Sequence, residues 1–451
     1  MSSTNKIFKT LFHVNNVIIK DADLYDDCNG VSHLKIKVSL YKKEKCRCPI
    51  CNRKCSRYDS PIYTRTWRGL DLGDTVSEIE MDSTRIFCKE HGVLLEGVPF
   101  AYHGSSFTKD FDLTVSFFAL NVSKLFVSEY MRISWLTVGR CISRARHDLE
   151  PDLKRRLNNL VRLGIDETSY KKGHSYITVV VNHDTNEVVW LHSGHGKEIL
   201  SLFFQELSDE QKKSIQIISG DGAKWIDACI EEYAPHIQRT IDSYHVCSWA
   251  QEALDEVRKQ CWHIANNKAK NCKAAKKKYS KGRPAISDED RQELKENKQY
   301  ACSIKNSKYA LGKNPENLTE YQQAKLEMIA SREPRLYRAY CLKEDLRKIL
   351  HCKDKDVADA LLKEWLSKAC RSKISQFVEL SRKIRRHKEH IINTIALDLS
   401  NARIESINNK IKLIIRKAYG FRNIDNMMDM IYLTCSNIKI PLNNRAKPSK
   451  A

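Results

Sequence analysis

The apolar and polar positions of the first hundred residues follow the two-residue period of β-strands. Apolar side chains alternate with polar ones along residues 34–40, and Val76, Ile79, Met81 and Ile86 recur within residues 75–87. Alternation of this kind predicts strands with one buried face. We therefore expect a small β-rich module over residues 30–100.

Residues 109–147 change to the helical period. Apolar residues recur at intervals of three and four in three short segments, and Ser134 stands where it would cap the third helix, residues 135–147. A tight turn at residues 132–134 precedes that helix. The pattern predicts a helix-turn-helix unit, with an ordinary helical linker as the alternative.

Strand patterning returns over residues 163–242, in the order βββαβαβ. Residues 176–181 and 187–191 are apolar runs joined by four polar residues, which predicts a hairpin. The continuous apolar run at 214–219 is typical of a strand covered on both faces. The remaining predicted elements are a strand beginning at residue 163, helices at 198–207 and 223–232, and a strand at 239–242.

A long, basic and helical region covers residues 246–395. Residues 268–283 contain eight Lys or Arg and no acid, and Gly282 and Pro284 interrupt this run, so part of it is predicted to be a loop. Strands and helices together predict a multidomain α/β protein.

The charge of the chain indicates an anionic partner. Lys and Arg number 77 against 56 Asp and Glu, a formal net charge of +21 over 451 residues. Such an excess favours nucleic acid, although solvated Lys-rich faces would also account for it. The sequence has no run of about 18 apolar residues and no apolar signal core, and most of its 16 cysteines are scattered singly. We therefore expect a cytoplasmic, nucleoid-associated protein with reduced thiols and no membrane partner.

Three acids stand where a divalent metal site could be built. Asp166 lies on the first strand of the 163–242 block, Asp221 lies two residues beyond the strand at 214–219, and 183 residues separate Asp221 from Glu405. Carboxylates at neighbouring strand ends converge and supply the hard oxygen ligands that Mg²⁺ prefers, and paired ions of this kind serve phosphodiester chemistry. Taken singly, each acid could instead be a turn, a helix cap or part of a solvated helix face.

The segment around Glu405 predicts a helix with two distinct faces. Its apolar stripe consists of Ile404, Ile407, Ile411 and Ile414. The adjacent face consists of Glu405, Asn408, Asn409 and Lys412.

Two pairs of metal-ligating residues stand in the N-terminal module. Cys48 and Cys51 form a C-x-x-C pair, and Cys88 and His91 form a C-x-x-H pair after 36 intervening residues. Two such pairs can close one tetrahedral structural zinc site, with free thiols in a small β-domain as the alternative. Two spare candidate ligands stand nearby, Cys46 and Cys55.

Most of the chain, from the N-terminal cysteines to about residue 430, resembles the DDE transposases of the ISL-three insertion-sequence family. The resemblance is carried by residues 163–167 with 172–176, by the Asp221 segment, and by Asp242-Ser243-Tyr244-His245. Its most specific part is Ile404-Glu405-x-x-Asn408-x-Lys410-Ile411-Lys412, which ends in Ala418-Tyr419-Gly420-Phe421-Arg422.

The resemblance implies an RNase H-like catalytic domain split by a helical insertion. It matches Asp166 and Asp221 to the two aspartates of the family and Glu405 to its glutamate, with Mg²⁺ or Mn²⁺ as the metal. Asp242 and His245 match an Asp-x-x-His signature and are expected to organise the site, with Asp242 a competitor of Asp221 as second ligand. Similar transposases usually carry four zinc-binding cysteines, so His91 departs from their pattern.

The expected function is recognition of terminal inverted repeats, followed by metal-dependent DNA cleavage and strand transfer by a homo-oligomer on DNA. The alternatives are a DNA-binding regulator with a disabled catalytic domain and a nuclease of the same fold. The expected division of the chain is a zinc module (1–100), a helix-turn-helix (101–150), a first RNase H-like part (160–245), the helical insertion (246–395), a final catalytic helix (396–435) and a basic tail (436–451). Residues expected to contact DNA are Thr137, Arg140, Arg144, Lys410, Arg416 and Lys417, and Asn408 and Lys412 are expected to support catalysis.

Overall fold

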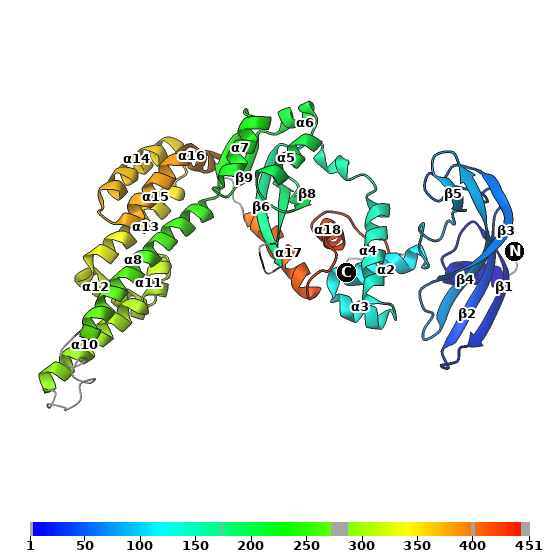
Figure 1. Cartoon of the computed structure of the whole chain (residues 1–451), viewed down its shortest axis with the longest axis horizontal. Helices are drawn as coiled ribbons and strands as arrows, with labels where there is room; N and C mark the ends of the chain where they lie inside the picture. The colour runs from blue at the N-terminus through cyan, green and yellow to red at the C-terminus, as the bar shows by residue number, and fades with distance from the viewer. Residues whose placement is uncertain (1–2, 172, 174, 272–286, 398–401, 443–451) are drawn as a thin grey trace, which may run out of the picture. The chain divides into compact units, whose positions relative to one another are not determined.

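The structure is a computed structural model that describes residues 3–171, 173, 175–271, 287–397 and 402–442 (Figure 1). Its contacts divide the chain into two compact units. The first unit comprises residues 1–156, 169–175 and 407–451, and the second comprises residues 157–168 and 176–406. Parts of three predicted segments lie outside the described residues: the motif at 172–176, the basic run at 268–283 and the tail at 436–451.

The first unit opens with helix α1 (Ser3–Leu11) and a five-stranded sheet. The order is β1-β2-β4-β3, and β5 also pairs with β4. The predicted strands are present as β2 (Ser32–Leu40) and β4 (Val76–Cys88). The strands that we did not predict are β1 (Val17–Asp26), β3 (Ser56–Arg68) and β5 (Gly92–Leu95). Exposed side chains dominate β3, so its sequence lacks the apolar alternation that marks a half-buried strand.

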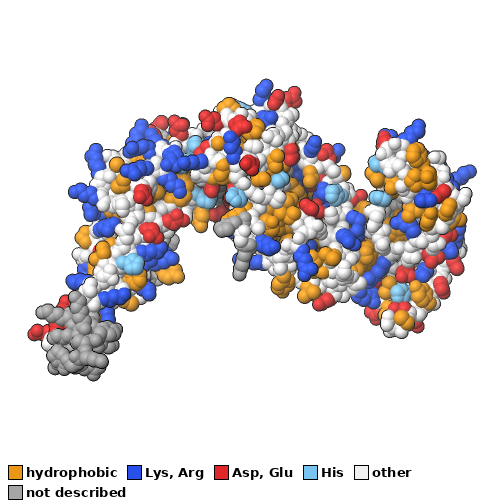
Figure 2. Space-filling view, in the orientation of Figure 1, with side chains coloured by type: hydrophobic (Ala, Val, Ile, Leu, Met, Phe, Trp, Pro, Cys, Tyr) orange, Lys and Arg blue, Asp and Glu red, His pale blue; other side chains and the backbone are white. Residues whose placement is uncertain are grey.

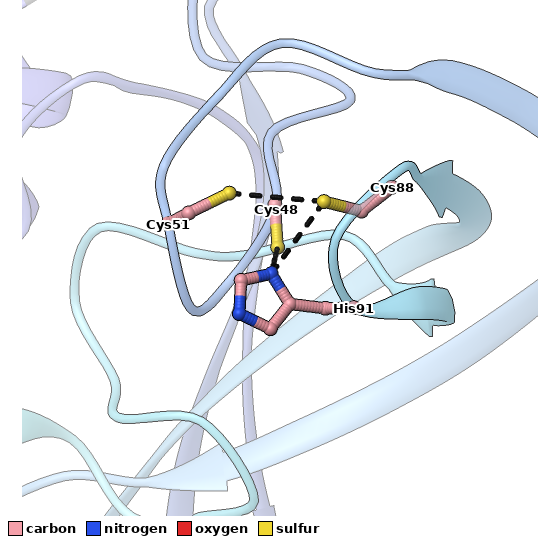
Figure 3. Close-up of side chains that lie close together, drawn as sticks. All are labelled: Cys48, Cys51, Cys88 and His91. Atoms are coloured by element: carbon pink, nitrogen blue, oxygen red, sulfur yellow. Dashed lines mark hydrogen bonds between the residues drawn. The ribbon is translucent and has the colours of Figure 1, made fainter.

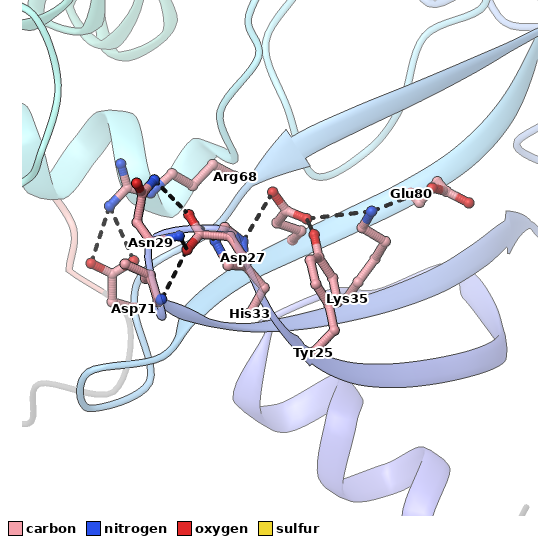
Figure 4. A network of polar contacts seen from close by, with 10 residues as sticks. Tyr25, Asp27, Asn29, His33, Lys35, Arg68, Asp71 and Glu80 are labelled. Atoms are coloured by element: carbon pink, nitrogen blue, oxygen red, sulfur yellow. Dashed lines mark hydrogen bonds and ion pairs between the residues drawn. The ribbon is translucent and has the colours of Figure 1, made fainter.

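Polar contacts connect β1, β2 and β4 across the sheet (Figure 4). The Tyr25 hydroxyl donates to Glu78 Oε2 at 3.0 Å, and Lys35 Nζ lies 3.6 Å from the same oxygen. His33 Nδ1 lies 3.5 Å from the other Glu78 oxygen. Because these groups are largely shielded from solvent, their pairing compensates the loss of hydration on this part of the sheet.

Three helices follow, α2 (Lys109–Asn121), α3 (Lys124–Tyr130) and α4 (Trp135–Leu149). The predicted cap of the third helix is confirmed, because Ser134 accepts a hydrogen bond from the Thr137 amide. The last helix of the chain, α18 (Ile424–Thr434), packs against α4 through a buried ion pair of Arg146 Nε and Asp429 Oδ1 at 2.8 Å. A C-terminal segment thus belongs to the same unit as the three-helix group.

The second unit contains a five-stranded sheet of order β10-β9-β6-β7-β8. Its strands are β6 (Arg162–Lys171), β7 (Ser175–Asn182), β8 (Glu187–Ser193), β9 (Ile217–Gly220) and β10 (Gln238–Ile241). The predicted hairpin is confirmed by antiparallel β7 and β8. β6, β9 and β10 are parallel, so their carboxyl ends meet at one edge of the sheet.

The helices of this sheet are α5 (Lys197–Glu206), α6 (Asp209–Ser214) and α7 (Lys224–Tyr233). The strand expected at 214–219 begins later than predicted, at Ile217. Ser208 caps α6, so residues 209–214 form a helix instead. The element order is therefore βββααβαβ. α5 and α7 share an apolar core with Leu163, Ile165 and Ile218 of the sheet, which leaves Gly164 facing the opposite side.

Helices fill the predicted insertion and form one apolar core (Figure 1). They are α8 (Ser243–Asn271), α10 (Asp288–Lys305), α11 (Lys308–Gly312), η2 (Pro315–Asn317), α12 (Glu320–Arg332), α13 (Pro334–Leu350), α14 (Lys355–Arg371), α15 (Ser375–Arg386) and α16 (Lys388–Leu397). α16 returns to the sheet, where Thr394 Oγ1 donates to the Ile241 carbonyl at 2.7 Å and accepts from the Ile241 amide at 3.1 Å. The insertion thus starts and ends beside β10. Within the described residues, no helix is long and apolar enough to cross a membrane.

Candidate active site and metal centre

Three aspartates occupy one row across the parallel strands. β6 pairs with β9 through Gly164 and Ser219, so continuing this register by two residues places Asp166 beside Asp221. β10 pairs with β9 through Ile241 and Gly220, so one further residue places Asp242 beside Asp221. Adjacent strands lie about 4.8 Å apart. We call Asp166, Asp221 and Asp242 the carboxylate row.

Each aspartate of the row also accepts a hydrogen bond from a backbone amide one or two residues later in the chain. Asp166 Oδ1 accepts from the Glu167 amide at 2.8 Å. Asp221 Oδ1 accepts from the Ala223 amide at 3.0 Å, before α7, and Asp242 Oδ1 accepts from the Tyr244 amide at 3.1 Å, at the start of α8. Asp221 therefore stabilises a turn before α7, whose N-cap Ala223 has no side-chain cap, whereas Asp242 caps the start of α8. Each of these two carboxylates has a second oxygen.

Helix α17 (Ala402–Lys417) reaches the sheet through a glycine contact. A Cβ built on Gly164 would lie 2.1 Å from Ile404 Cδ1, so a side chain at this position would collide with α17. Gly164 and Asp166 are two residues apart on β6 and therefore point to the same face of the sheet. Glu405 follows Ile404 directly, which brings the start of α17 to the face that carries Asp166.

The acids influence one another electrostatically. Burial raises the pKa of Asp242, His245 opposes this effect, and the charge of Glu405 adds to it. Burial also raises the pKa of Glu167, whose carboxylate lies 3.8 Å from His195 Nδ1, and the charges of Asp221 and Asp166 raise it further. The end of this sheet therefore concentrates negative charge that a cation would relieve.

The spacing of the predicted triad exceeds that of a single-ion site. Within the described residues, the carboxylate oxygens of Asp166, Asp221 and Glu405 do not all lie within 4.8 Å of one another. One Mg²⁺ holds its oxygen ligands at about 2.1 Å, which would require shorter separations. Two ions about 3.5–4 Å apart accommodate a wider set of carboxylates.

The N-terminal unit gathers a second set of ligands (Figure 3). Cys48 and Cys51 lie in the loop after β2, Cys88 ends β4, and His91 lies in the turn before β5, yet their ligand atoms lie within 4.8 Å of one another. We call these four residues the cysteine cluster. Cys51 and Cys88 Sγ are 3.7 Å apart, and His91 Nδ1 lies 3.7 Å from Cys48 Sγ and 3.5 Å from Cys88 Sγ.

These separations match the edges of a tetrahedral zinc site. Zn–S bonds of about 2.3 Å and Zn–N bonds of about 2.0–2.1 Å give edges of about 3.8 Å between sulfurs and about 3.6 Å between sulfur and nitrogen. A disulfide would need about 2.05 Å. The hydrogen bond from His91 lowers the pKa of Cys88 to about 6, which favours the thiolate that binds metal. Cys46 and Cys55 pack beside the cluster but do not belong to it.

Comparison with known proteins decides the family. The sequence model DDE_Tnp_ISL3, described as Transposase, matches residues 163–431, more than half of the chain. The transposase for insertion sequence element IS1557 of Mycobacterium tuberculosis is 39% identical over 446 residues, covering 98% of this chain and 97% of that protein. The chain belongs to the ISL3 family of DDE transposases.

A more distant relative extends this result. The transposase for insertion sequence element IS1001 of Bordetella parapertussis is 22% identical over 394 residues, covering 86% of this chain and 88% of its own length. In the present chain, the region that matches the family model includes the carboxylate row, the helical insertion and α17. The cysteine cluster lies before it, within the longer alignment to the IS1557 protein.

Helix α17 of the transposase has the two predicted faces with one difference. The stripe of Ile404, Ile407, Ile411 and Ile414 is buried, as expected. On the adjacent face Glu405 and Lys412 are exposed, whereas Asn408 is only 7% exposed. Of the expected DNA contacts on this helix, Lys410 and Arg416 are exposed, and Lys417 Nζ donates to the Asn121 carbonyl at 3.1 Å.

The three-helix group of the transposase presents its expected DNA contacts unequally. Arg140 is exposed, and Thr137 is half-buried with its hydroxyl 2.8 Å from that of Ser134. Arg144 instead binds both oxygens of the fully buried Asp112 at 2.7 Å. This ion pair holds Arg144 against α2, whereas Arg140 is exposed.

The structure also reveals groups that the motif analysis missed. Glu167 and His195 form an ion pair beside the carboxylate row. The sequence offered one indication that Glu167 lies near the site, because it directly follows Asp166. Asp227, His387 and His390 form another close group of possible ligands, here called the histidine cluster. Burial lowers the pKa of both histidines. The spacing of His387 and His390 was visible in the sequence, but nothing in it indicated Asp227 as their neighbour.

Proposed function

We propose that this chain is the transposase of an insertion sequence and that Asp166, Asp221 and Glu405 are its catalytic carboxylates. The observation that carries the proposal is the shared register row of Asp166, Asp221 and Asp242, with the start of α17 packed against Gly164. The strand order β8-β7-β6-β9-β10, with an insertion that starts and ends beside β10, supports an RNase H-like domain split by helices.

The donor set fits Mg²⁺ or Mn²⁺. Carboxylate oxygens are the hard ligands that these ions prefer. Burial and, to a smaller extent, neighbouring acids raise the pKa values of Asp242 and Glu167, and a bound cation would oppose both effects. A bound pair of ions would supply charge stabilisation at the attacking and leaving oxygens of a phosphodiester. The reaction comprises two successive phosphoryl transfers, in which water frees a 3′ hydroxyl and that hydroxyl then attacks target DNA.

The other residues of the site position these acids. Asp242 anchors the first turn of α8 and, with His245, organises the site beside Asp221. Asn408 and Lys412 follow Glu405 by three and seven residues along α17. Their amide and ammonium groups would orient bound DNA, while the exposed Lys410 and Arg416 neutralise strand phosphates. Lys417 would contribute to this basic face if DNA displaced its bond to α2.

Recognition of the terminal inverted repeats is assigned to the first unit. The cysteine cluster fits structural Zn²⁺, which would tie the loop after β2 to the turn before β5. Thr137 and Arg140 on α4 are proposed to contact DNA, with Arg144 supporting the helix through Asp112. Figure 2 shows many further Lys and Arg side chains over the α14–α16 end of the insertion, which suits non-specific phosphate contacts. The active species is expected to be a homo-oligomer on DNA.

The decisive experiment replaces Asp166 by Asn in the full chain. Cleavage and strand transfer at the element ends should be lost while end binding persists, because the substitution removes charge without adding volume. Asp288→Asn is the matched control, since the side chain of Asp288 is 99% exposed on α10. Retained cleavage by the Asp166 variant would remove this residue from the site. Cleavage by the unaltered protein without strand transfer would indicate a nuclease, and end binding without cleavage would indicate a regulator.

A further inference from the structure

The histidine cluster lies where the insertion rejoins the sheet domain. Asp227 belongs to the first turn of α7, the helix that follows Asp221. His387 ends α15 and His390 lies in the first turn of α16, the helix that returns beside β10. One ligand atom from each of the three side chains lies within 4.8 Å of the other two. The group therefore joins α7 to the helices that lead back toward α17.

His387 is buried and His390 is half-buried, and each imidazole has a shielded nitrogen without a hydrogen-bond partner in the described part of the chain. His387 is 2% exposed, and the Nδ1 atoms of His387 and His390 are buried with no hydrogen-bond partner within the described part of the chain. A buried polar atom without a partner costs on the order of 1–3 kcal/mol. These two nitrogens are thus available to coordinate a metal ion or to accept a hydrogen bond.

The carboxylate of the cluster is held in place by a buried arginine. Arg239 Nε donates to Asp227 Oδ1 at 3.1 Å, and further Arg239 hydrogen bonds reach the carbonyls of Ile218 and Thr240. Outer contacts of this kind orient a metal-binding side chain. The positive charge of Arg239 also disfavours a cation held by charge alone, so the imidazoles must provide most of the affinity.

We propose that Asp227, His387 and His390 bind one divalent transition-metal ion of the zinc class, separate from the cysteine cluster and from the carboxylate row. Two imidazoles and one carboxylate suit Zn²⁺ and its neighbours rather than Mg²⁺ or Ca²⁺. Ligands at about 2.0–2.2 Å in a tetrahedral site lie about 3.4 Å apart. The three ligand atoms lie within 4.8 Å of one another without an ion, so binding would draw them closer.

The position of this site defines its role. A Cβ built on Gly222 would lie 3.7 Å from His387 Nε2 and 2.6 Å from Cζ2 of Trp249, so the loop that carries Asp221 packs directly against the cluster and α8. An ion bound here would fix that loop to the junction of α15 and α16. The site is structural, and it couples the insertion to the sheet end on which Asp221 lies.

The test measures zinc bound to the purified full chain in excess Mg²⁺, which occupies oxygen sites but does not compete for imidazole. We expect about two zinc ions per chain, one in the cysteine cluster and one here. His390→Ala and Asp227→Asn should each reduce this to about one, while His263→Ala, on an exposed part of α8, should leave about two. Substituted Co²⁺ should keep its thiolate absorption in His390→Ala and lose it in Cys88→Ser.

A thermal readout separates metal loss from misfolding. Zinc should raise the melting temperature of the Cys88→Ser protein, and His390→Ala added to Cys88→Ser should abolish this rise while leaving the metal-free melting temperature nearly unchanged. The proposal is overturned if the unaltered chain binds only the zinc that Cys88→Ser removes, or if His390→Ala retains the full zinc content. Neither result depends on DNA cleavage, so the catalytic assignment is tested independently.

Discussion

The cysteine cluster and the carboxylate row differ in whether a neighbouring group helps to stabilise an anionic ligand. At the cysteine cluster, the His91 hydrogen bond lowers the pKa of Cys88 to about 6, so this neighbour favours the anionic ligand. The pKa of Cys51 is raised, because the hydrogen bond from the Arg53 backbone is outweighed by burial, Cys48 and Cys88 together. At the carboxylate row, burial and neighbouring acids raise the pKa values of Glu167 and Asp242. The first arrangement is close to a finished site, whereas the second carries a repulsion that only cations would offset.

Distances show the same contrast. Three separations among the ligand atoms of the cysteine cluster already match the edges of a tetrahedron. The proposed catalytic carboxylates do not form a group within 4.8 Å among the described residues. A structural metal site is closed by its protein ligands, whereas a catalytic site keeps positions open for water and substrate. This difference predicts that changes at the two sites affect separate properties of the protein.

The largest effect is expected from Glu405→Gln. Loss of this carboxylate should reduce DNA cleavage by roughly a thousandfold or more, because metal-assisted charge stabilisation contributes several kcal/mol and each 1.36 kcal/mol is tenfold in rate. The melting temperature should change little, since Glu405 is exposed. Glu293→Gln on the exposed face of α10 is the control and should cleave normally. Cleavage by the Glu405 variant at the normal rate would contradict its catalytic role.

The next effect concerns binding rather than chemistry. Cys88→Ser should remove zinc from the N-terminal unit and weaken binding to the element ends by roughly tenfold or more, because structural zinc supplies on the order of 10 kcal/mol to such modules. Cys28→Ser changes an exposed thiol of the same unit and should alter neither zinc content nor binding. Zinc analysis and end-binding titrations check this, and an unchanged zinc content would refute the ligand set.

The sequence predicted the members of the cysteine cluster more completely than it predicted the fold. Cys48-x-x-Cys51 and Cys88-x-x-His91 have spacings set by ligand geometry, so local sequence was sufficient to identify the cluster. β3 escaped because its exposed side chains carry no alternation. We did not predict helix α6, because the strand was assigned from the apolar run that follows it and the capping signal at Ser208 was not considered.

Long-range contacts were beyond the sequence. The sequence of α4 suggested that Arg144 is exposed and did not predict its ion pair with Asp112. That ion pair depends on how α2 and α4 pack. The histidine cluster joins Asp227 to residues 160 or more positions later, and no local pattern connects them. The register row also required the strand pairing itself, although the acids that compose it were identified individually.

A smaller effect tests how α17 is held against the sheet. Gly164→Ala would place a methyl group against Ile404 Cδ1, so α17 must shift at the end that carries Glu405. Overpacking of this kind costs about 1–3 kcal/mol, and we expect cleavage to fall by about tenfold. Ile404→Val removes the nearest colliding atom and should partly restore both stability and cleavage in the double variant. Strict additivity of the two substitutions would show that Gly164 and Ile404 do not interact.

The smallest effect concerns the repulsion at the carboxylate row. Because the pKa of Glu167 is raised above its usual 4.5, the folded state binds a proton more readily than the unfolded chain. The stabilisation from that proton is complete below pH 4.5 and is lost as the pH rises through the raised pKa. Glu167→Gln cannot lose a proton, so without metal its melting temperature should exceed that of the unaltered protein by about 1–2 °C at pH 7 and match it near pH 4. Scanning calorimetry at both pH values measures the difference, with Glu293→Gln showing none. Added Mg²⁺ should reduce the gap by offsetting the charges of Asp221 and Asp166, which add to the effect of burial. A gap that is equal at both pH values would show that neither burial nor these charges raise the pKa of Glu167.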